Sequence, residues 1–286
     1  MKRIAAWALL ALALLAVVPA WSGTARGVRK QAESSLRVTG NIVIGTDGTV
    51  KAHELDPEAP LTPALADFIG RSVAQWRFEP VKVDGEVVVA KVPMSLRLVA
   101  KRSDDGNYEV RIASTHFDGS KPHVGTDVPQ AAEMDPPVFP RQAMRMGGKG
   151  VVYLVVQFGA DGKVMNVDAE QVNLRVAGTD SQMKQLRKQF TDASIRAARN
   201  WVFVPPTTGE EAGRSDWLVR VPVDFKFAGE PDSKPGDWDT YIPGPRNRDM
   251  PWAHEQLETA GSPDALPDSG VYSLREGAKL LTPPAA

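Results

Sequence analysis

Residues Val151 to Val164 read VVYLVVQFGADGKV, and this stretch decides the fold class. Its first eight residues are mostly β-branched or aromatic, which favours a buried strand. Asp161-Gly162 is typical of a tight hairpin turn, because glycine accepts the positive φ that such turns need. Residues 163 to 168 then return as a second strand. The stretch therefore predicts an antiparallel hairpin.

A second copy of this pattern lies earlier in the chain, and it brings two further landmarks with it. In each copy the Asp-Gly turn is followed by an aromatic motif ending in proline and by a strand that contains Val-Pro. The pairs are Ile44–Val50 with Phe158–Val164, Trp76–Pro80 with Trp201–Pro205, and Val92–Leu98 with Val221–Phe227. Because three landmarks recur in the same order, we infer an internal repeat.

A helix is predicted between the turn and the aromatic motif of each copy. In the second copy Met183, Leu186, Phe190, Ala197 and Trp201 share one helical face, so the helix runs from about residue 181 to 200. In the first copy the start signal is Thr62 as N-cap with Pro63 at the first helical position. Each copy is thus predicted to be β-β-α-β.

The closing strands of both copies contain a proline, Pro93 and Pro222. Proline cannot donate to a strand ladder, so both strands are expected to be edge strands or to be bulged at that point. In the first copy the chain turns near Asp104–Asn107 and returns as a further strand, which we expect to cover that edge. The second copy would then keep an open edge.

Composition and charge narrow the function classes. The chain has 286 residues, a net charge of -1 and no cysteine. The balanced charge gives no basic field for nucleic acid, which excludes that partner class. The absence of cysteine excludes disulfides, iron–sulfur clusters and cysteine zinc sites.

The N-terminus has the pattern of a targeting segment. Lys2-Arg3 precedes an apolar run from Ile4 to Val18, the form of a secretory signal peptide. We expect residues 1–25 to be a signal peptide that directs the chain to the periplasm. The alternative is a short inner-membrane anchor with the rest of the chain facing the periplasm.

The rest of the chain divides by composition. The first copy is predicted to span residues 36–114, a polar linker residues 115–135, and the second copy residues 136–228. From residue 229 to 286 the sequence is rich in proline and acidic, so we expect a largely disordered tail. Trp238, Tyr241, Ile242 and Trp252 leave open that part of it folds back onto the second copy.

The second copy resembles a known family. Its motifs are Pro137-Val138-Phe139-Pro140, Gly148-Lys149-Gly150-Val151, Asp161-Gly162-Lys163-Val164, Trp201-Val202-Phe203-Val204-Pro205 and Val221-Pro222-Val223-Asp224-Phe225. In this order they are similar to the C-terminal domain of the TonB energy-transducer family, over about residues 136–227. The first copy, about residues 36–98, lacks the Pro-x-aromatic-Pro opening and resembles a degenerate duplicate. The expected fold is α+β, with two tandem domains that each have a small antiparallel sheet and one helix.

The resemblance implies a function. TonB C-terminal domains bind the extended TonB box of outer-membrane receptors by adding it as a strand to the sheet edge. Carried over to this chain, the peptide-binding edge is the closing strand: Leu218, Val219, Arg220, Val221, Pro222, Val223, Asp224, Phe225, Lys226 and Phe227. The implied role is support of TonB-dependent transport. It implies no catalytic residue, metal or cofactor.

Two departures from the family shape the expected role. The apolar N-terminal segment has no ionisable residue within it, and only about fifteen residues separate it from the first copy, a reach of roughly 50 Å. We therefore expect a TonB-like binding protein rather than an energy transducer. The alternative is a periplasmic scaffold with a TonB-like fold and another periplasmic partner. A homodimer formed by strand exchange is left open.

The residues that could support catalysis form no recognisable constellation. His53, His116, His123 and His254 fit no metal-ligand spacing and are interpreted as surface histidines. Gly147–Gly150 leads into a strand rather than a helix, so it is not a phosphate loop. The sequence thus predicts a protein that is not an enzyme.

Overall fold

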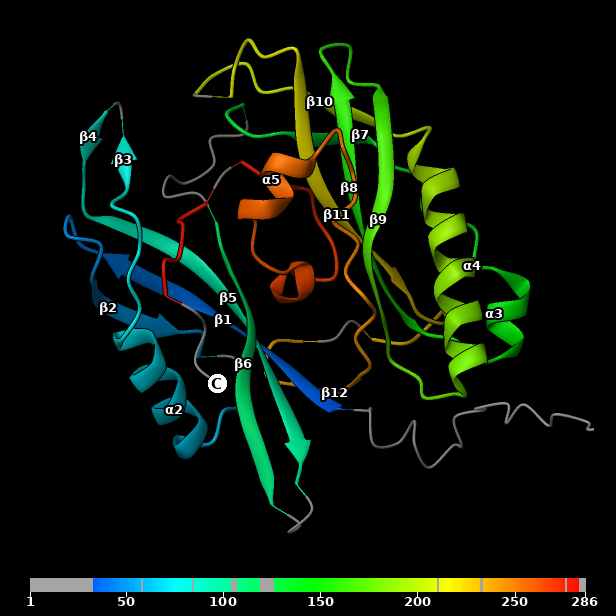
Figure 1. Cartoon of the computed structure of the whole chain (residues 1–286), viewed down its shortest axis with the longest axis horizontal. Coiled ribbons are helices and arrows are strands. Elements are labelled where there is room, and N and C mark those ends of the chain that lie inside the picture. Colours follow the sequence, from blue (N-terminus) through cyan, green and yellow to red (C-terminus); the bar gives the residue numbers. More distant parts are fainter. Residues whose placement is uncertain are drawn as a thin grey trace, which may run out of the picture.

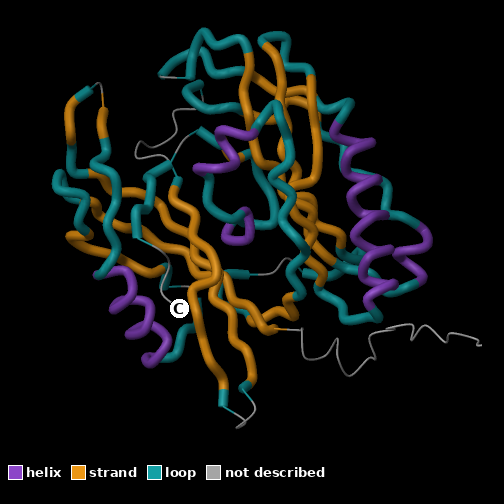
Figure 2. Tube along the Cα trace, in the orientation of Figure 1, coloured by secondary structure: helices purple, strands orange, loops and turns teal. Residues whose placement is uncertain are grey.

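The computed structural model describes residues 33–57, 59–83, 85–103, 107–118, 126–209, 211–231, 234–275 and 277–282. The expected signal peptide or anchor at residues 1–25 lies outside the described residues. The fold is mixed α+β, with mostly antiparallel sheets and few helices. Figures 1 and 2 show one sheet with its helix on each side of the molecule and the C-terminal tail between them.

The first sheet is built around two long strands. β1 (Glu33–Ile44) pairs with β2 (Val50–Leu55) and with β5 (Ala90–Arg102), and β5 also pairs with β6 (Tyr108–Phe117). Helix α2 (Pro63–Ala74) follows β2, and the short strands β3 (Lys82–Val83) and β4 (Glu86–Val87) form a separate hairpin. The helix begins at Pro63 with Thr62 as N-cap, as predicted.

The second sheet also has a central strand with an antiparallel neighbour on each side. β8 (Gly150–Gly159) pairs with β9 (Val164–Leu174) on one side and with β11 (Asp216–Phe225) on the other. Helix α4 (Asp180–Ala198) packs on this sheet, and α3 (Arg141–Arg145) packs on α4. Thr179 and Gln182 form a capping box at the start of α4, which the sequence interpretation missed.

Each sheet has its own apolar core. In the first, Trp76 and Phe78 are buried beneath α2 with the inward residues of β1 and β5. In the second, Trp201 and Phe203 are buried with Phe190 of α4 and the inward residues of β8 and β11. The alternation predicted for the closing strands is therefore present in both.

The two Asp-Gly turns make matching contacts. Gly48 has φ 74° and Gly162 has φ 77°. The Phe78 N–H donates to the Gly48 carbonyl at 2.8 Å, and the Phe203 N–H donates to the Gly162 carbonyl at 2.9 Å. A Cβ at either glycine would collide with the carbonyl oxygen of the same phenylalanine. Glycine is therefore required twice over, by backbone angle and by close approach.

The two closing strands differ from expectation in one case. β5 is an interior strand, and its bulge lies between Arg97 and Leu98, so the prediction that it is an edge strand or is bulged at Pro93 was wrong. Asp118 donates its N–H to the Pro93 carbonyl at 3.0 Å, just beyond the last residue of β6. Because N–H and C=O of one residue point the same way, the missing N–H of Pro93 falls where that ladder ends. The covering strand expected after residue 101 is present as β6.

The segment expected to be a linker is partly structured. β6 extends to Phe117, and β7 (Gln130–Glu133) pairs with β10 (Val202–Val204) of the second half. The segment between them includes residues 119–125, which lie outside the described residues.

The tail was expected to be largely disordered, and the structure differs. Its described parts contain β12 (Trp238–Tyr241), α5 (His254–Thr259), the 3-10 turn η1 (Pro263–Ala265) and β13 (Tyr272–Ser273). β12 pairs with β1 of the first half, and β13 pairs with β11 of the second. The tail thus lies between the two halves and bonds to both (Figure 1). Packing against two sheets supplies the apolar burial that its composition did not suggest.

Candidate functional site

The candidate site is the outer edge of β11. β8 pairs with β11 along its whole length, whereas β13 pairs on the other side only with Val219 and Arg220. The Leu274 N–H donates to the Leu218 carbonyl at 3.0 Å, so the main chain of Leu218 faces this outer side. Main-chain groups alternate along a strand, and those of Arg220, Pro222 and Asp224 therefore face outward too. Pro222 has its missing N–H on this side.

A groove follows the part of the edge that β13 leaves uncovered. Its volume is about 640 Å³, and Val221 to Lys226 form one wall. The tail segment from Pro267 to Val271 forms the opposite wall. Arg37 of β1 and a set of apolar side chains complete the lining, the latter including Met134, Pro136, Pro137, Phe139 and Trp201.

The structure separates the ten predicted edge residues into three groups. Six of them, Val221 through Lys226, line the groove. Leu218, Val219 and Arg220 are buried, and the tail covers them. Phe227 stacks on Phe139 with ring centroids 5.6 Å apart and does not line the groove.

The Pro-x-aromatic-Pro motif shapes the apolar side of the groove. Phe139 packs edge-on against Phe190 of α4 and Phe225 of β11. The Trp201 Nε1–H donates to the Asp135 carbonyl at 2.8 Å and holds the start of this segment in place. This hydrogen bond joins the Trp-x-aromatic-x-Pro motif to the segment that leads into the Pro-x-aromatic-Pro motif, although more than sixty residues separate the two in the chain.

The polar side of the groove is an ionic cluster. The Arg175 guanidinium contacts Asp224 of β11 at 2.7 Å and Asp268 of the tail at 2.8 Å. Burial raises the pKa of the Asp224 carboxyl to about 6, against the opposing effect of Arg175. The Asp268 Oδ1 atom is shielded from solvent and has no hydrogen-bond partner among the described residues. The cluster ties the tail to the strand edge.

A buried ion cluster fixes the tail to the face of the second sheet that lies away from α4. Glu170 has no exposed surface and accepts from Arg220 at 2.7 and 2.9 Å and from Arg246 of the tail at 2.6 Å. Arg220 also donates to the Gly261 carbonyl of the tail at 2.9 Å. Sequence reasoning missed these contacts, because alternation along β11 placed Arg220 on a solvent-facing side. No local pattern links charges so far apart in the chain.

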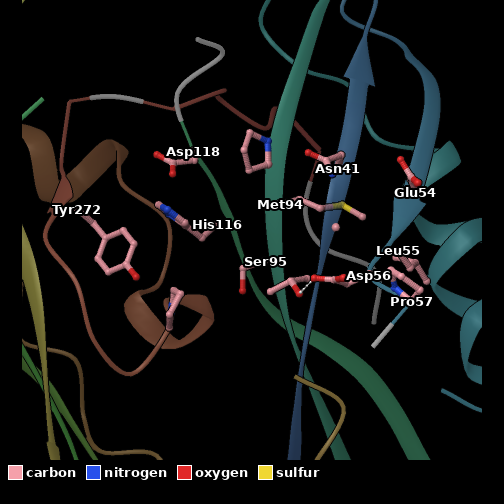
Figure 3. A pocket seen from close by; sticks show the side chains of 14 residues that line it. Asn41, Glu54, Leu55, Asp56, Pro57, Met94, Ser95, His116, Asp118 and Tyr272 are labelled. Carbon is pink, nitrogen blue, oxygen red and sulfur yellow. Dashed lines mark hydrogen bonds between the residues drawn. The ribbon is translucent and has the colours of Figure 1, made fainter. Parts of the chain in front are cut away.

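A second cavity lies between the first sheet and the tail, with a volume of about 450 Å³. Figure 3 shows His116, Asp118 and Tyr272 on one side and Glu54, Leu55 and Asp56 on the other. Burial lowers the pKa of His116 to about 4, and its ring lies edge-on to Tyr272 at 5.5 Å. His116 is therefore half-buried against the tail rather than a surface histidine. Among the described residues, no three side chains are placed to hold a metal ion.

The second half is thus a small antiparallel sheet with α4 packed on it, the short α3 beside α4, and an incompletely covered closing strand. Comparison with known proteins finds similarity over about a third of the chain. The chain is 32% identical over 91 residues to protein TonB2 of Pseudomonas aeruginosa, and these cover 32% of this chain and 28% of that protein. It is 38% identical over 95 residues to protein TonB of Xanthomonas campestris pv. campestris, covering 32% of this chain and 35% of that protein.

These similarities confirm the resemblance drawn from the motifs: the chain contains a TonB-like C-terminal domain. The chain spans about a third of the length of the curated relatives that it matches. No protein-family model matches the chain, and no solved structure matches it. In the ranges that the structure describes, no helix is both long and apolar enough to cross a membrane.

Proposed function

We propose that this protein binds extended peptide segments of outer-membrane receptors, such as the TonB box, at the open part of the β11 edge, in support of TonB-dependent transport. The proposal rests chiefly on the groove beside Val221–Lys226. This groove lies along the part of the edge whose main-chain groups face outward without a neighbouring strand. An extended peptide there would gain main-chain hydrogen bonds from Pro222 and Asp224 and apolar contact from Phe139.

The two halves are, in this proposal, copies of one β-β-α-β unit. Support comes from the matched strand neighbours and from the matched contacts of Gly48 and Gly162 with Phe78 and Phe203. The first copy has its closing strand paired with β6. Peptide binding is therefore assigned to the second copy.

Location and partner follow from the same proposal. A TonB-box partner requires the periplasm, which agrees with the signal-like N-terminus of the sequence. Retention of that segment would leave the protein anchored to the inner membrane. N-terminal sequencing of the mature protein separates the two cases, since cleavage near residue 25 removes Lys2 and Arg3. No role in coupling to the proton-motive force is proposed.

A second candidate function is a periplasmic scaffold that binds a different protein. The observation that favours it is the tail, which fills the edge at Val219 and Arg220 and so shortens the surface left for a peptide. The two candidates differ in what the edge recognises.

Titration of the purified protein with synthetic TonB-box peptides, followed by backbone amide shifts, tests the proposal. We expect saturable shifts confined to Val221–Lys226. Asp224→Pro should weaken binding about tenfold or more, because it removes an outward N–H and places a ring at the edge. Asp224→Ala is the matched control: it removes the same carboxylate but keeps the N–H, so it should retain most of the affinity. A folded protein whose edge shows no shifts would rule out TonB-box capture and leave the scaffold function.

A further inference from the structure

The tail segment Pro267–Tyr272, called the tail wall below, leaves the β11 edge at a defined point. β13 pairs Tyr272 with Arg220, and an uninterrupted strand would continue beside Val221 and Pro222. Instead Gly270 adopts φ 121°, a backbone angle that favours glycine. The Tyr272 hydroxyl donates to the Ser269 carbonyl at 2.7 Å and closes this turn. The tail wall therefore faces β11 across the groove rather than pairing with it.

The tail wall is held firmly at both ends. Leu266, just before it, is fully buried against Val151 and Tyr153 of β8. Leu274, just after it, is buried against Leu218 and residues of α5. Arg175 bonds Asp268 in the middle of the segment. Displacing the wall would expose two leucines and break an ion pair, so the wall is a fixed part of the groove.

Asp268 presents an unused acceptor within this wall. Its Oδ2 atom accepts from Arg175 at 2.8 Å, whereas its Oδ1 atom is shielded from solvent and has no partner within the part of the chain that the structure describes. Leaving a buried acceptor unsatisfied is costly, and more so for a charged group. The Asp268 side chain keeps 16% of its surface exposed and lines the groove, so a turn of the carboxylate toward the groove would let an arriving donor reach Oδ1.

The strand geometry fixes which peptide side chains meet Asp268. Along β11 the odd-numbered side chains face the α4 core, and Asp224 faces the tail. Side chains of a peptide added beside this edge would alternate in the same way. One set would contact the apolar side, with Met134 and Phe139, and the other would lie toward Asp224 and Asp268.

Building on the proposed function, we infer that the tail wall determines the specificity of the peptide site. It ends the available edge at Arg220, so an added peptide pairs only with Val221–Lys226. Asp268 accepts a hydrogen bond from a tail-facing side chain of the peptide. The site therefore selects extended peptides in which apolar side chains alternate with hydrogen-bond donors, with threonine favoured over the isosteric valine.

The test uses host peptides that carry threonine or valine at one position, with the exchange scanned along the peptide, and isothermal titration of the full chain. We expect a preference for threonine of about tenfold at tail-facing positions and none at the alternate positions. Asp268→Ala should bring the threonine-to-valine ratio close to one. A purely structural role of Asp268 would change both affinities equally and leave the ratio intact.

Asp239→Ala is the matched control, because Asp239 also lies near Arg175, at 3.9 Å, but does not line the groove. It should leave the preference unchanged. Peptides that bind the edge without a threonine preference, or shift the amides of Leu218 and Arg220, would overturn the inference while the proposed function stands. Failure of every peptide to bind would overturn both.

Discussion

β5 and β11 each pair along one side with a long central strand of their own sheet, and they differ in what lies on their second side. β5 is paired with β1 on one side and with β6 through most of its length on the other. β11 is paired with β8, but its second side meets only the two residues of β13. A similar strand pattern thus gives a strand with two neighbours in one half and a strand beside a groove in the other. What decides the difference is the segment that follows each strand.

The positions of the two prolines show which side of each strand lacks a neighbour. Pro93 has its missing N–H at the end of the β5–β6 ladder, and Pro222 has its own on the uncovered side of β11. In both strands the ladder to the central strand is unaffected. Proline is therefore tolerated where a second neighbour is absent.

The largest expected effect comes from moving proline to the paired side of β11. Val219→Pro removes an N–H that faces β8 and replaces a fully buried core side chain. We expect a loss of more than about 3 kcal/mol of unfolding free energy, measured by chemical denaturation. Pro222→Val, on the uncovered side, should change stability by less than about 1 kcal/mol. Equal effects of the two changes would contradict the assignment of sides.

The next effect concerns the tail that partly replaces a covering strand. Glu170→Gln leaves Arg220 and Arg246 without their buried carboxylate, and we expect a loss of about 3 kcal/mol. Hydrogen exchange should show faster opening of residues 244–275 than of β8. As a control, Asp192→Asn breaks the exposed pair with Lys188 and should cost about 0.5 kcal/mol or less. Unchanged exchange in the tail would show that other contacts hold it.

The smallest effect is a pH dependence at the groove. Burial raises the pKa of Asp224 to about 6 from an ordinary 3.8. Between these values the folded state binds more protons than the unfolded chain, so this group lowers stability progressively as the pH rises from about 4 to 6. Asp224→Asn should flatten that part of the stability profile, measured by thermal melts across pH. A profile identical to that of the unchanged protein would mean that Asp224 titrates normally.

Most of the fold could be predicted from local sequence patterns. The Asp161-Gly162 turn and the Thr62-Pro63 helix start each depend on neighbouring residues and appear in the structure as predicted. The inward-facing set of β11 also does, although the tail buries the opposite face as well. The groove beside Val221–Lys226 falls within the strand that the family resemblance indicated. These features could be read because their physical causes lie within a few residues of one another.

The tail could not be predicted in the same way. Its order depends on contacts such as Arg246 with Glu170 and β12 with β1, which join residues far apart in the chain. Proline-rich, acidic composition suggests disorder only when no surface is available to cover. Here the outer faces of two sheets provide that surface, and composition carries no information about them.

The return of the tail to the first half also sets an order of events during synthesis. The Arg77 N–H donates to the Thr282 hydroxyl, 205 residues further along the chain, and the Glu79 N–H donates to the Lys279 carbonyl. The first half therefore lacks part of its contacts until the tail has emerged, although its core residues are made early. A nascent chain must keep this surface unpaired until translation of the tail is complete, which makes synthesis the stage at which the protein is most exposed to misassembly.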